Sequence, residues 1–331
     1  MVCEWSDKIF GVTESSFETL ALEVFQFQYQ KNTVYKAFVD ALGVNPSAVN
    51  SVEKIPFLPI QFFKTHKITT TSFEAEAVFE SSGTTQLIRS KHFVKSLQLY
   101  QQSFITGFEN IYGSLSNYCV LGLLPSYLEQ KNSSLVFMVN NFIQKSNHPE
   151  SGFYLYDFEN LANTLKKLEK EKQKTLLLGV SFALLDFAAQ FPIPLQHTIV
   201  METGGMKGRQ EEITRASLHA VLKKSFQSET IHSEYGMTEL LSQAYSAGAG
   251  IFNCPQWMKI LIREKEDPLQ IVNTKQGKTG LGAFNIIDLA NVYSCSFIAT
   301  EDVGNFFGEK KFELLGRLDN SELRGCSQLV I

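Results

Sequence analysis

The sequence has few cysteines, no long apolar run and no excess of basic residues, and each absence argues against a class of protein. Its five cysteines include no C-x-x-C pair, so we expect neither a disulfide framework nor a structural zinc site. No stretch approaches the roughly 18 consecutive apolar residues of a membrane span, and the start lacks the apolar core of a signal peptide. The net charge is −4 with scattered basic residues, which argues against a nucleic-acid binder. We therefore expect a cytoplasmic protein.

Apolar and aromatic residues, by contrast, are plentiful. Hydrophobic residues make up 44% of the 331 residues, and phenylalanine occurs 27 times against two tryptophans. This length and composition predict one large core with a small appendage. The phenylalanines fit either a densely packed core or an apolar ligand channel, and composition does not separate the two. Cys119, Cys254 and Cys295 lie among apolar residues, where we expect small buried side chains.

The first third of the chain has the pattern of helices packed on a core. Apolar residues recur at helical spacing from Glu14 to Ala41, with an interruption near Lys31. Between Ile55 and Ile60 two prolines bracket apolar residues, which predicts an extended segment folded onto the core. A long helix is predicted over 91–111, with its apolar residues on one side.

The middle of the chain alternates between strand-like and helix-like segments. Strands are predicted at 118–124, 175–180 and 197–201, and helices at 133–143, 161–171 and 210–226. This alternation is typical of helices layered on a largely parallel sheet. After residue 250 shorter strands are predicted at 257–262, 283–287 and 293–298, and we expect these to be antiparallel. The predicted fold class is α/β, with layered sheets and helices.

A loop of small polar residues, "ESSGTTQ" at 80–86, has the composition of an anion site. Successive backbone N–H groups and hydroxyls in such a loop can surround a phosphate. It is not a Walker loop, because the G-x-x-x-x-G-K-[ST] spacing is missing here and around Gly277. Alone, a loop of this kind is more often an ordinary turn or helix cap.

A second segment, "SEYGMTELLSQ" at 233–243, has residues in an order that suits a nucleotide. Tyr235 offers a flat face to a base, Thr238 a donor to a phosphate and Glu239 an oxygen ligand to Mg²⁺. The alternative interpretation is that Thr238 merely caps a helix over 239–243.

Two further polar segments lie near the end of the sequence. "ATEDVG" at 299–304 carries Asp302, which is either a turn residue or a carboxylate for ribose hydroxyls. "GRLDNSE" at 316–322 carries Arg317, whose guanidinium can bind ribose or phosphate oxygens. Each segment alone is weak evidence for a nucleotide site, but the order and spacing of the four segments along the chain are distinctive.

In that order and spacing the four segments resemble the adenylate-forming superfamily of acyl-CoA synthetases, adenylation domains and luciferases. Ser81–Thr85 resembles the phosphate loop, Tyr235–Glu239 the Y-G-x-T-E motif, Thr300–Asp302 the T-G-D motif and Gly316–Asp319 the G-R-x-D hinge motif. The implied fold is that of the large N-terminal domain of these enzymes, and the implied cofactors are ATP and Mg²⁺.

The resemblance also implies a role for each matching residue. Tyr235 stacks on adenine, Thr238 meets the α-phosphate and Glu239 holds Mg²⁺. Asp302 binds ribose and Arg317 contacts the nucleotide. The full implied nucleotide-binding set is Ser81, Ser82, Gly83, Thr84, Thr85, Gly204, Gly205, Tyr235, Gly236, Met237, Thr238, Asp302 and Arg317, in which Gly204 and Gly205 resemble the segment beside the adenine and the acyl group.

Within that superfamily the chain most resembles the acyl-protein synthetases of the bacterial bioluminescence type. The matching segments are "IPFLPIQFFK" at 55–64, "TGGMKGR" at 203–209 and "LRGCSQLV" at 323–330. The resemblance implies ATP-dependent activation of a fatty acid or other carboxylic acid, then transfer to a cysteine thiol for a partner acyl reductase. Cys326 is the implied acyl carrier, because a thiolate attacks an acyl-adenylate readily and AMP is a good leaving group.

The chain departs from the superfamily pattern at three points. Gln86 replaces the second glycine of the phosphate loop, and Glu301 replaces the glycine of T-G-D. The sequence also stops about a dozen residues after the hinge motif, so we expect the small C-terminal domain and its catalytic lysine to be missing. Lys207, Arg209 or Arg89 are candidates for the replacement cation.

The predicted organisation is a helical layer at 1–75, an adenylate-forming core at 76–318 and a tail at 319–331. The catalytic candidates are Cys326, Thr238, Lys207 and Arg209. Two other functions stay open. One is a ligase, similar to phenylacetate-CoA ligase, that passes the acyl group to coenzyme A or a carrier protein. The other is a catalytically degenerate nucleotide-binding subunit that steadies a partner reductase.

Overall fold

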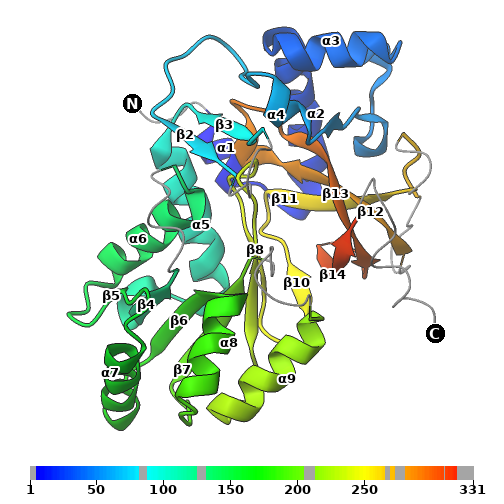
Figure 1. Cartoon of the computed structure of the whole chain (residues 1–331). Helices are drawn as coiled ribbons and strands as arrows, with labels where there is room; N and C mark the ends of the chain where they lie inside the picture. The colour runs from blue at the N-terminus through cyan, green and yellow to red at the C-terminus, as the bar shows by residue number, and fades with distance from the viewer. Residues whose placement is uncertain are drawn as a thin grey trace.

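One large mixed sheet runs through the molecule (Figure 1). The computed structural model describes residues 5–81, 88–124, 132–204, 213–264, 269–272, 280–308 and 310–318. Within these ranges the sheet has 12 strands in the order β11-β12-β13-β14-β10-β9-β8-β7-β6-β4-β5, with β1 paired to β13. The pairings among β4, β5, β6, β7 and β8 are parallel. The pairings β8–β9, β9–β10, β10–β14, β14–β13, β13–β12 and β12–β11 are antiparallel. The predicted α/β fold class is confirmed.

The parallel half consists of strands that alternate with helices along the chain. Its elements are β4 (Cys119–Leu123), α6 (Ser134–Ser146), β5 (Gly152–Phe153), α7 (Phe158–Lys170), β6 (Thr175–Val180), α8 (Ser181–Gln190), β7 (Thr198–Thr203), α9 (Arg215–Phe226) and β8 (His232–Tyr235). Every residue of β4 and β6 is buried, as expected of parallel strands that are covered on both faces. The predicted strands and helices of this half are confirmed, except that the helix predicted over 210–226 begins at Arg215, where Thr214 caps it. Helix α8 was not predicted, because it begins directly after β6 and its apolar residues continue the strand's apolar run.

The antiparallel half comprises β9 (Ala244–Ser246), β10 (Ile251–Asn253), β11 (Met258–Arg263), β12 (Gly280–Asp288), β13 (Phe297–Phe306) and β14 (Lys311–Arg317). The predicted antiparallel pairing is confirmed. The strand predicted at 293–298 begins only at Phe297, because a 3-10 turn, η4 (Leu289–Asn291), and its following bend occupy the preceding residues. At Gly304 a side chain would collide with the carbonyl oxygen of Glu313, so the close approach of β13 and β14 requires glycine.

The N-terminal helices pack on the antiparallel half. They are α1 (Ser6–Phe10), α2 (Glu14–Lys31), α3 (Thr33–Ala41) and α4 (Phe62–Thr65), with 3-10 turns η1 (Pro46–Ala48) and η2 (Val52–Lys54). The predicted break lies at Asn32, whose side chain accepts a hydrogen bond from Tyr35 N and so caps α3. The predicted extended segment is confirmed as β1 (Leu58–Pro59), which pairs in parallel with β13. The division of the chain at residue 75 stays a prediction.

A hairpin stands apart from the large sheet. It consists of β2 (Ala77–Glu80) and β3 (Lys91–Val94), paired antiparallel with each other as a separate two-stranded sheet. The helix predicted from residue 91 is therefore wrong over its first residues. Helix α5 (Leu97–Tyr112) begins after Ser96, whose side chain accepts a hydrogen bond from Leu99 N. The 3-10 turn η3 (Leu115–Asn117) then leads into β4.

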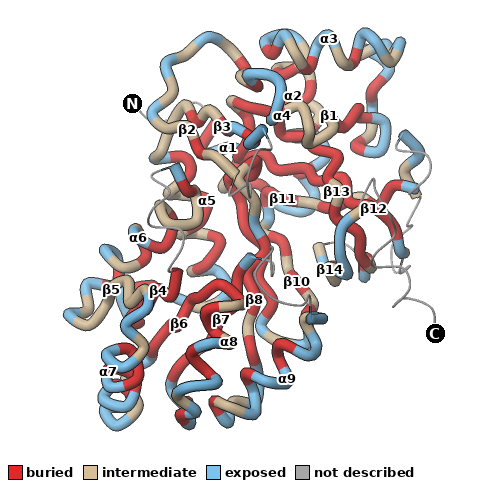
Figure 2. The backbone as a smooth tube through the Cα atoms, in the orientation of Figure 1, coloured by how far each residue is buried: buried red, intermediate tan, exposed pale blue. Residues whose placement is uncertain are grey.

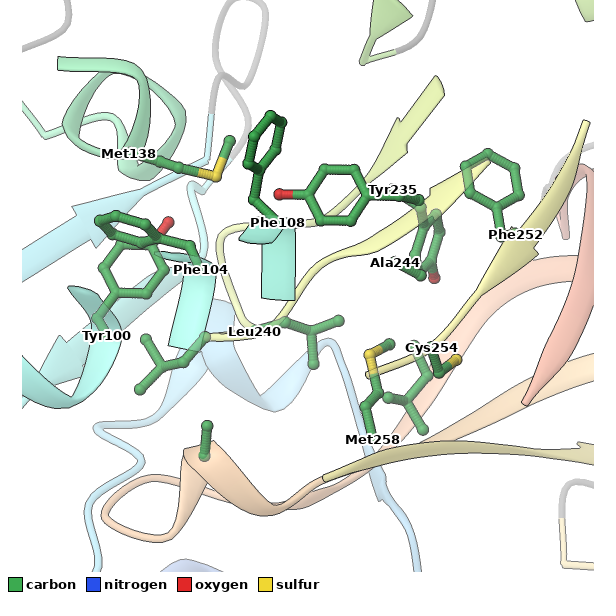
Figure 3. Close-up of a cluster of buried hydrophobic side chains, with 14 of the residues drawn as sticks. Tyr100, Phe104, Phe108, Met138, Tyr235, Leu240, Ala244, Phe252, Cys254 and Met258 are labelled. Carbon is green, nitrogen blue, oxygen red and sulfur yellow. The ribbon is translucent and has the colours of Figure 1, made fainter. Parts of the chain in front are cut away.

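Aromatic side chains fill the space between α5, α6 and the sheet. Figure 2 shows buried residues concentrated along the central strands, and Figure 3 shows Phe104 and Phe108 of α5 beside Met138 of α6. Phe104, Phe108 and Phe142 are fully buried, and Phe108 packs against Phe142 with ring centroids 5.0 Å apart. These phenylalanines form a packed core. The three predicted buried cysteines, Cys119, Cys254 and Cys295, are confirmed as buried.

None of the helices in the described part of the chain has both the length and the apolar character that crossing a membrane requires.

Replacing Phe108 by alanine tests the weight of this aromatic core. Its ring contacts Tyr112, Tyr118, Phe142 and Tyr245, so the substitution leaves a cavity and we expect a loss of about 3–5 kcal/mol in the free energy of unfolding. The measurement is urea unfolding followed by circular dichroism. The matched control on the same helix is Ile111→Ala, since Ile111 is 42% exposed and should change stability by less than about 0.5 kcal/mol. Equal losses for both variants would contradict the core assignment.

Candidate functional site

The candidate site lies where parallel strands β6, β7 and β8 end. The register pairs Val180 with Thr203, and Thr203 with Glu234, so the segments that follow these strands leave the sheet along one edge. Ligands of open α/β sheets bind at this carboxyl edge. Gly204 follows β7 with a φ of 69°, a conformation that glycine adopts without strain. Its carbonyl oxygen accepts a hydrogen bond of 3.0 Å from Ser181 Oγ, at the start of α8.

Three of the predicted nucleotide motifs meet at one carboxylate. The hydroxyl of Tyr235 donates to Asp302 Oδ2 over 2.6 Å, and Arg317 Nε donates to Asp302 Oδ1 over 3.0 Å. Asp302 and Arg317 are also register partners on β13 and β14. The Asp302 side chain is 4% exposed, whereas that of Arg317 is half exposed. The Y-G-x-T-E, T-G-D-like and G-R-x-D segments, which are far apart in sequence, are thus joined by direct hydrogen bonds.

Tyr235 is held as a buried ring. It is 5% exposed, and the edges of Phe252 and Phe312 pack against it with centroids 5.9 Å and 5.2 Å away. Figure 3 shows Tyr235 and Phe252 in this buried cluster. Burial and the charge of Asp302 raise the pKa of Tyr235 far above its ordinary value, so the hydroxyl keeps its proton and acts as a donor. The predicted stacking on adenine stays a prediction.

The segment that carries Asp302 is fixed by backbone and side-chain hydrogen bonds. Thr300 Oγ1 donates to the carbonyl oxygen of Phe284 over 3.0 Å, and Arg263 donates to the carbonyl oxygen of Thr300 over 2.5 Å. Glu301 stands where the motif has glycine, and its carboxylate accepts a 2.6 Å hydrogen bond from Gln61. Gln61 belongs to the segment "IPFLPIQFFK". The departure from T-G-D therefore links the N-terminal part of the chain to the site.

The segment after β8 is a turn. Thr238 and Glu239 lie in that turn and the chain continues into β9, so the alternative in which Thr238 caps a helix over 239–243 is wrong. Backbone N–H groups of Leu241 and Ser242 donate to Asp288 Oδ2, each over 3.0 Å. In a helix these two N–H groups would instead donate to backbone carbonyl oxygens of the preceding turn. Gly236 and Met237 precede the turn, exposed and half-buried respectively.

Glu239 and Thr238 are anchored through their carbonyl oxygens. Asn291 Nδ2 donates to the Glu239 carbonyl over 2.8 Å, and His92 Nδ1 lies 2.9 Å from the Thr238 carbonyl. The Glu239 residue is 6% exposed. Within the described ranges no group of three or more His, Cys, Asp or Glu side chains is arranged to hold a metal ion. The role of Glu239 as a Mg²⁺ ligand stays a prediction.

Two buried carboxylates lie under the ends of β7 and β8. Glu202 Oε1 is 3.1 Å from Arg215 Nε and 3.5 Å from His219 Nε2. Burial alone would raise the pKa of Glu202, but its hydrogen bond with His219 and the charge of Arg215 outweigh burial and lower it. Glu234 accepts a short hydrogen bond from Thr203 Oγ1. Burial, assisted by the charge of Glu202, raises the pKa of Glu234 to about 7.

Glu234 also limits what residue can follow Tyr235. A Cβ atom at Gly236 would lie 2.5 Å from Glu234 Oε1 and 3.4 Å from Gln243 Cγ. A side chain at this position of the Y-G-x-T-E segment would therefore displace the Glu234 carboxylate, which Thr203 holds by a hydrogen bond. No sequence pattern points to this contact of Glu234, because an acid at the end of a strand has no distinctive spacing.

The proposed phosphate loop begins at the tip of the β2–β3 hairpin. Ser81 is paired with Ser90, through Ser81 N to Ser90 O at 3.1 Å and Ser90 N to Ser81 Oγ at 3.0 Å. Glu80 lies 3.8 Å from Arg89 and 3.5 Å from Lys91, so Arg89 is an ion-pair partner in this structure. The other predicted loop residues, Ser82, Gly83, Thr84 and Thr85, lie outside the described residues, as do Gly205, Lys207, Arg209 and Cys326.

Comparison with known proteins supplies the family. The model of the family described as "Acyl-protein synthetase, LuxE" matches residues 4–331. The chain belongs to this family. The match covers the candidate site and the segments that carry its motifs, and it confirms the resemblance drawn from the sequence. No curated protein matches the sequence.

Three solved structures are similar to this acyl-protein synthetase family member over part of their length. The O-succinylbenzoate coenzyme A synthetase of Bacillus subtilis, in complex with ATP and magnesium ion, matches with a TM-score of 0.50 and 14% identity, over 77% of this chain and 53% of that one. Its AMP complex matches with a TM-score of 0.47 and 14% identity, over 72% and 49%. A mutant coronafacic acid ligase of Pectobacterium brasiliense matches with a TM-score of 0.43 and 17% identity, over 63% and 41%. The chain spans about half the length of these structures.

The pH dependence of stability tests the state of Glu234. Its folded pKa of about 7 lies above the ordinary value of 4.5, so Glu234 stabilises the fold fully below pH 4.5 and this stabilisation is lost as pH rises through 7. Glutamine does not ionise, so the Glu234→Gln variant does not lose stability in this way as the pH rises. We expect the variant to gain about 3 kcal/mol relative to the unaltered chain between pH 4.5 and pH 8, measured by urea unfolding at a series of pH values.

Glu202→Gln is the matched control, because the lowered pKa of Glu202 has the opposite effect. Its stabilisation is present above pH 4.5 and is lost only in acid. The deficit of Glu202→Gln should therefore shrink below pH 5, and between pH 5 and pH 8 it should change only by the part of the Glu234 pKa shift that the charge of Glu202 causes. Parallel stability curves for Glu234→Gln and the unaltered chain would show that Glu234 has an ordinary pKa.

Proposed function

We propose that this chain activates a carboxylic acid with ATP to an acyl-adenylate and then transfers the acyl group to a thiol. The observation that carries the proposal is the meeting of Tyr235 and Arg317 at Asp302, in a member of the acyl-protein synthetase family. Each of these residues comes from a different predicted nucleotide segment. A family match alone does not require that the three segments meet, so the geometry is independent support.

The Asp302 carboxylate suits a ribose. Among the described residues it accepts one hydrogen bond at each oxygen, and a carboxylate has about four acceptor positions. Counted over those residues, two positions are left for ribose hydroxyls. Arg317 balances the negative charge of Asp302 from its half-exposed position, and in the proposal it also contacts the nucleotide.

The phosphates of ATP would lie between the hairpin loop that starts at Ser81 and the turn at Thr238. The B. subtilis synthetase was solved with ATP and magnesium ion, and we extend both to this chain as part of the proposal. Glu239 is the candidate ligand for Mg²⁺, which as a bound ion offsets the negative charge of the phosphates. The residues of the hairpin loop and of "TGGMKGR" would orient the phosphates toward the acid.

The reaction has two steps. A carboxylate oxygen of the acid attacks the α-phosphorus of ATP, and pyrophosphate leaves with the electron pair of the broken P–O bond. The thiolate of Cys326 then attacks the carbonyl carbon of the acyl-adenylate, and AMP leaves. Lys207 and Arg209 are the candidates that would stabilise negative charge in the first step. We propose a fatty acid as the substrate and an acyl reductase as the final partner, from the sequence resemblance.

Isotope exchange between pyrophosphate and ATP tests the first step. The unaltered chain should catalyse this exchange only when a suitable acid is present, and a series of fatty acids of increasing length identifies the acid. Nucleotide binding without exchange at any chain length would favour the degenerate nucleotide-binding subunit. Rapid formation of acyl-CoA without self-acylation would favour the coenzyme A ligase.

Replacing the proposed carrier cysteine separates the two steps. Cys326→Ala should keep the exchange reaction and lose covalent labelling by a radioactive acid, because only the second step uses the thiol. Cys3→Ala is the control and should keep both. If Cys326→Ala is still labelled to the same extent, Cys326 is not the carrier.

The proposed ribose contact is tested by Asp302→Asn. Loss of the carboxylate charge should raise the KM for ATP about tenfold or more, because hydrogen bonds to a charged group contribute about 1.5–3 kcal/mol. Tyr235→Phe removes one donor to Asp302 and keeps the ring, so its effect should be smaller. The KM for the acid should not change in either variant. An unchanged KM for ATP in a folded Asp302→Asn variant would exclude a ribose contact.

A further inference from the structure

The β2–β3 hairpin that carries the proposed phosphate loop is not a part of the large sheet. Its strands pair only with each other among the described strands, from Ala77 opposite Val94 to Glu80 opposite Lys91. No ladder of backbone hydrogen bonds therefore sets the distance between this hairpin and the sheet. Other contacts of the described residues must do so, and they decide where Ser81, at the end of β2, stands relative to the turn at Thr238.

His92, in the middle of β3, makes the contact that reaches this turn. Its Nδ1 lies 2.9 Å from the carbonyl oxygen of Thr238, and its Nε2 lies 2.8 Å from Ser294 Oγ. The residue is 1% exposed, so water does not replace either partner. The edge of its ring packs against Phe63 of α4 at a centroid distance of 5.8 Å.

The carbonyl partner and the neutral state of the ring together fix the direction of both bonds. A carbonyl oxygen only accepts, so His92 Nδ1 carries the hydrogen and donates to Thr238. Burial lowers the pKa of His92 to about 4, so at neutral pH the ring carries one hydrogen and Nε2 accepts from the Ser294 hydroxyl. Both ring nitrogens are satisfied in this one tautomer. The ring is locked in orientation by two elements, the turn after β8 and the bend after η4.

The other contacts of the hairpin are less directional or lie further from the turn. Phe79 of β2 packs against Tyr100 and Phe137, with centroids 5.5 Å and 5.7 Å away, which holds the hairpin on the α5–α6 side. Glu80 N donates to the carbonyl oxygen of Asn132 over 2.9 Å. Apolar packing tolerates small shifts along a surface, whereas a buried hydrogen bond has a narrow range of length.

We propose that His92 is a positioning residue that sets the placement of the phosphate-loop hairpin against the turn of Thr238 and Glu239. The inference rests on the proposed function, in which ATP is held between these two segments. A change at His92 should then weaken the use of ATP without altering the use of the acid. Small displacements of groups that orient a reactant are costly in rate.

The test compares His92→Asn with His92→Gln in the pyrophosphate exchange reaction. The amide nitrogen of asparagine stands at the same number of bonds from the backbone as Nδ1, so it can still donate to the Thr238 carbonyl. The amide nitrogen of glutamine stands at the same number of bonds from the backbone as Nε2. With the backbone in the same position, it cannot donate to the Thr238 carbonyl. We expect His92→Gln to raise the KM for ATP about tenfold, and His92→Asn by no more than about threefold, with the KM for the acid unchanged in both.

Ser294→Ala is the matched control, because it removes the partner of Nε2 and leaves the Thr238 contact. It should lower the melting temperature but change the KM for ATP by less than about twofold. Melting temperatures of all variants separate a loss of stability from a loss of hairpin placement. If His92→Gln does not fold, His92→Asn still tests the inference. A tenfold rise in the KM for ATP with asparagine, which keeps the donor to the Thr238 carbonyl, would contradict the inference.

The outcomes separate this inference from the proposed function. No exchange by the unaltered chain would overturn both. Exchange by the unaltered chain with an unchanged KM for ATP in His92→Gln would overturn only the role of His92. Equal rises in the KM for ATP and for the acid, or equal effects of asparagine and glutamine, would show that His92 contributes packing alone and would also overturn the inference.

Discussion

The pairing of Tyr235 and Arg317 with the Asp302 carboxylate is the contact on which the candidate site depends. Asp302 is on β13, Arg317 on β14 and Tyr235 at the end of β8, so the carboxylate connects the antiparallel half of the sheet to the last parallel strand. A buried carboxylate is unfavourable unless it is paired and hydrogen-bonded. Asp302 has a donor at each oxygen, and its pairing with a half-exposed arginine keeps its charge close to solvent. The site can therefore hold a charge at the boundary between two halves that differ in architecture.

A layer of buried ionisable groups supports the edge where the parallel strands end. Glu202 is paired with His219 and Arg215 of α9. Burial and the nearby charge of Glu202 raise the pKa of Glu234 to about 7. The guanidinium of Arg215 also donates to the Leu314 carbonyl over 2.9 Å. Arg215 of α9 thus links β7 to β14, the strand that ends in Arg317, through one salt bridge and one hydrogen bond. Two adjacent carboxylates with opposite shifts avoid placing two negative charges side by side in the core.

Much of the fold was predictable from the sequence, because the burial of a strand or helix produces a recognisable pattern of apolar residues. Continuous apolar runs such as β4 and β6 indicate strands covered on both faces, and both were predicted with nearly correct bounds. The pattern failed where two elements share apolar character, as at the junction of β6 with α8, and where a short strand precedes a helix, as at His92 and Leu97. In these cases the bounds of the elements depend on strand pairing. The paired strands lie too far apart in sequence for a local pattern to reveal the pairing.

The candidate site was predictable as a set of motifs but not as a set of contacts. Tyr235, Asp302 and Arg317 were identified by residue type and order, whereas their mutual hydrogen bonds depend on the register of β13 and β14. His92 was given no role from the sequence, since its partner Thr238 is 146 residues away. The same limit applies to Gln61 and Glu301, which are 240 residues apart.

The contact between Gln61 and Glu301 gives the departure from T-G-D a structural meaning. A glycine at this position would leave the Gln61 amide without that acceptor, and the N-terminal segment would keep its other ties to β13, which include the short β1 ladder, the bond from Ile60 N to Ala299 O and the packing of Phe57 on Phe297. With glutamate, a side-chain hydrogen bond is added directly beside Asp302. The backbone of Glu301 is fixed as well, since its carbonyl oxygen accepts from Leu318 N over 2.6 Å. Glu301 therefore joins the N-terminal segment to the residue that follows Arg317, so the position of the hinge segment depends on a part of the chain that precedes every nucleotide motif.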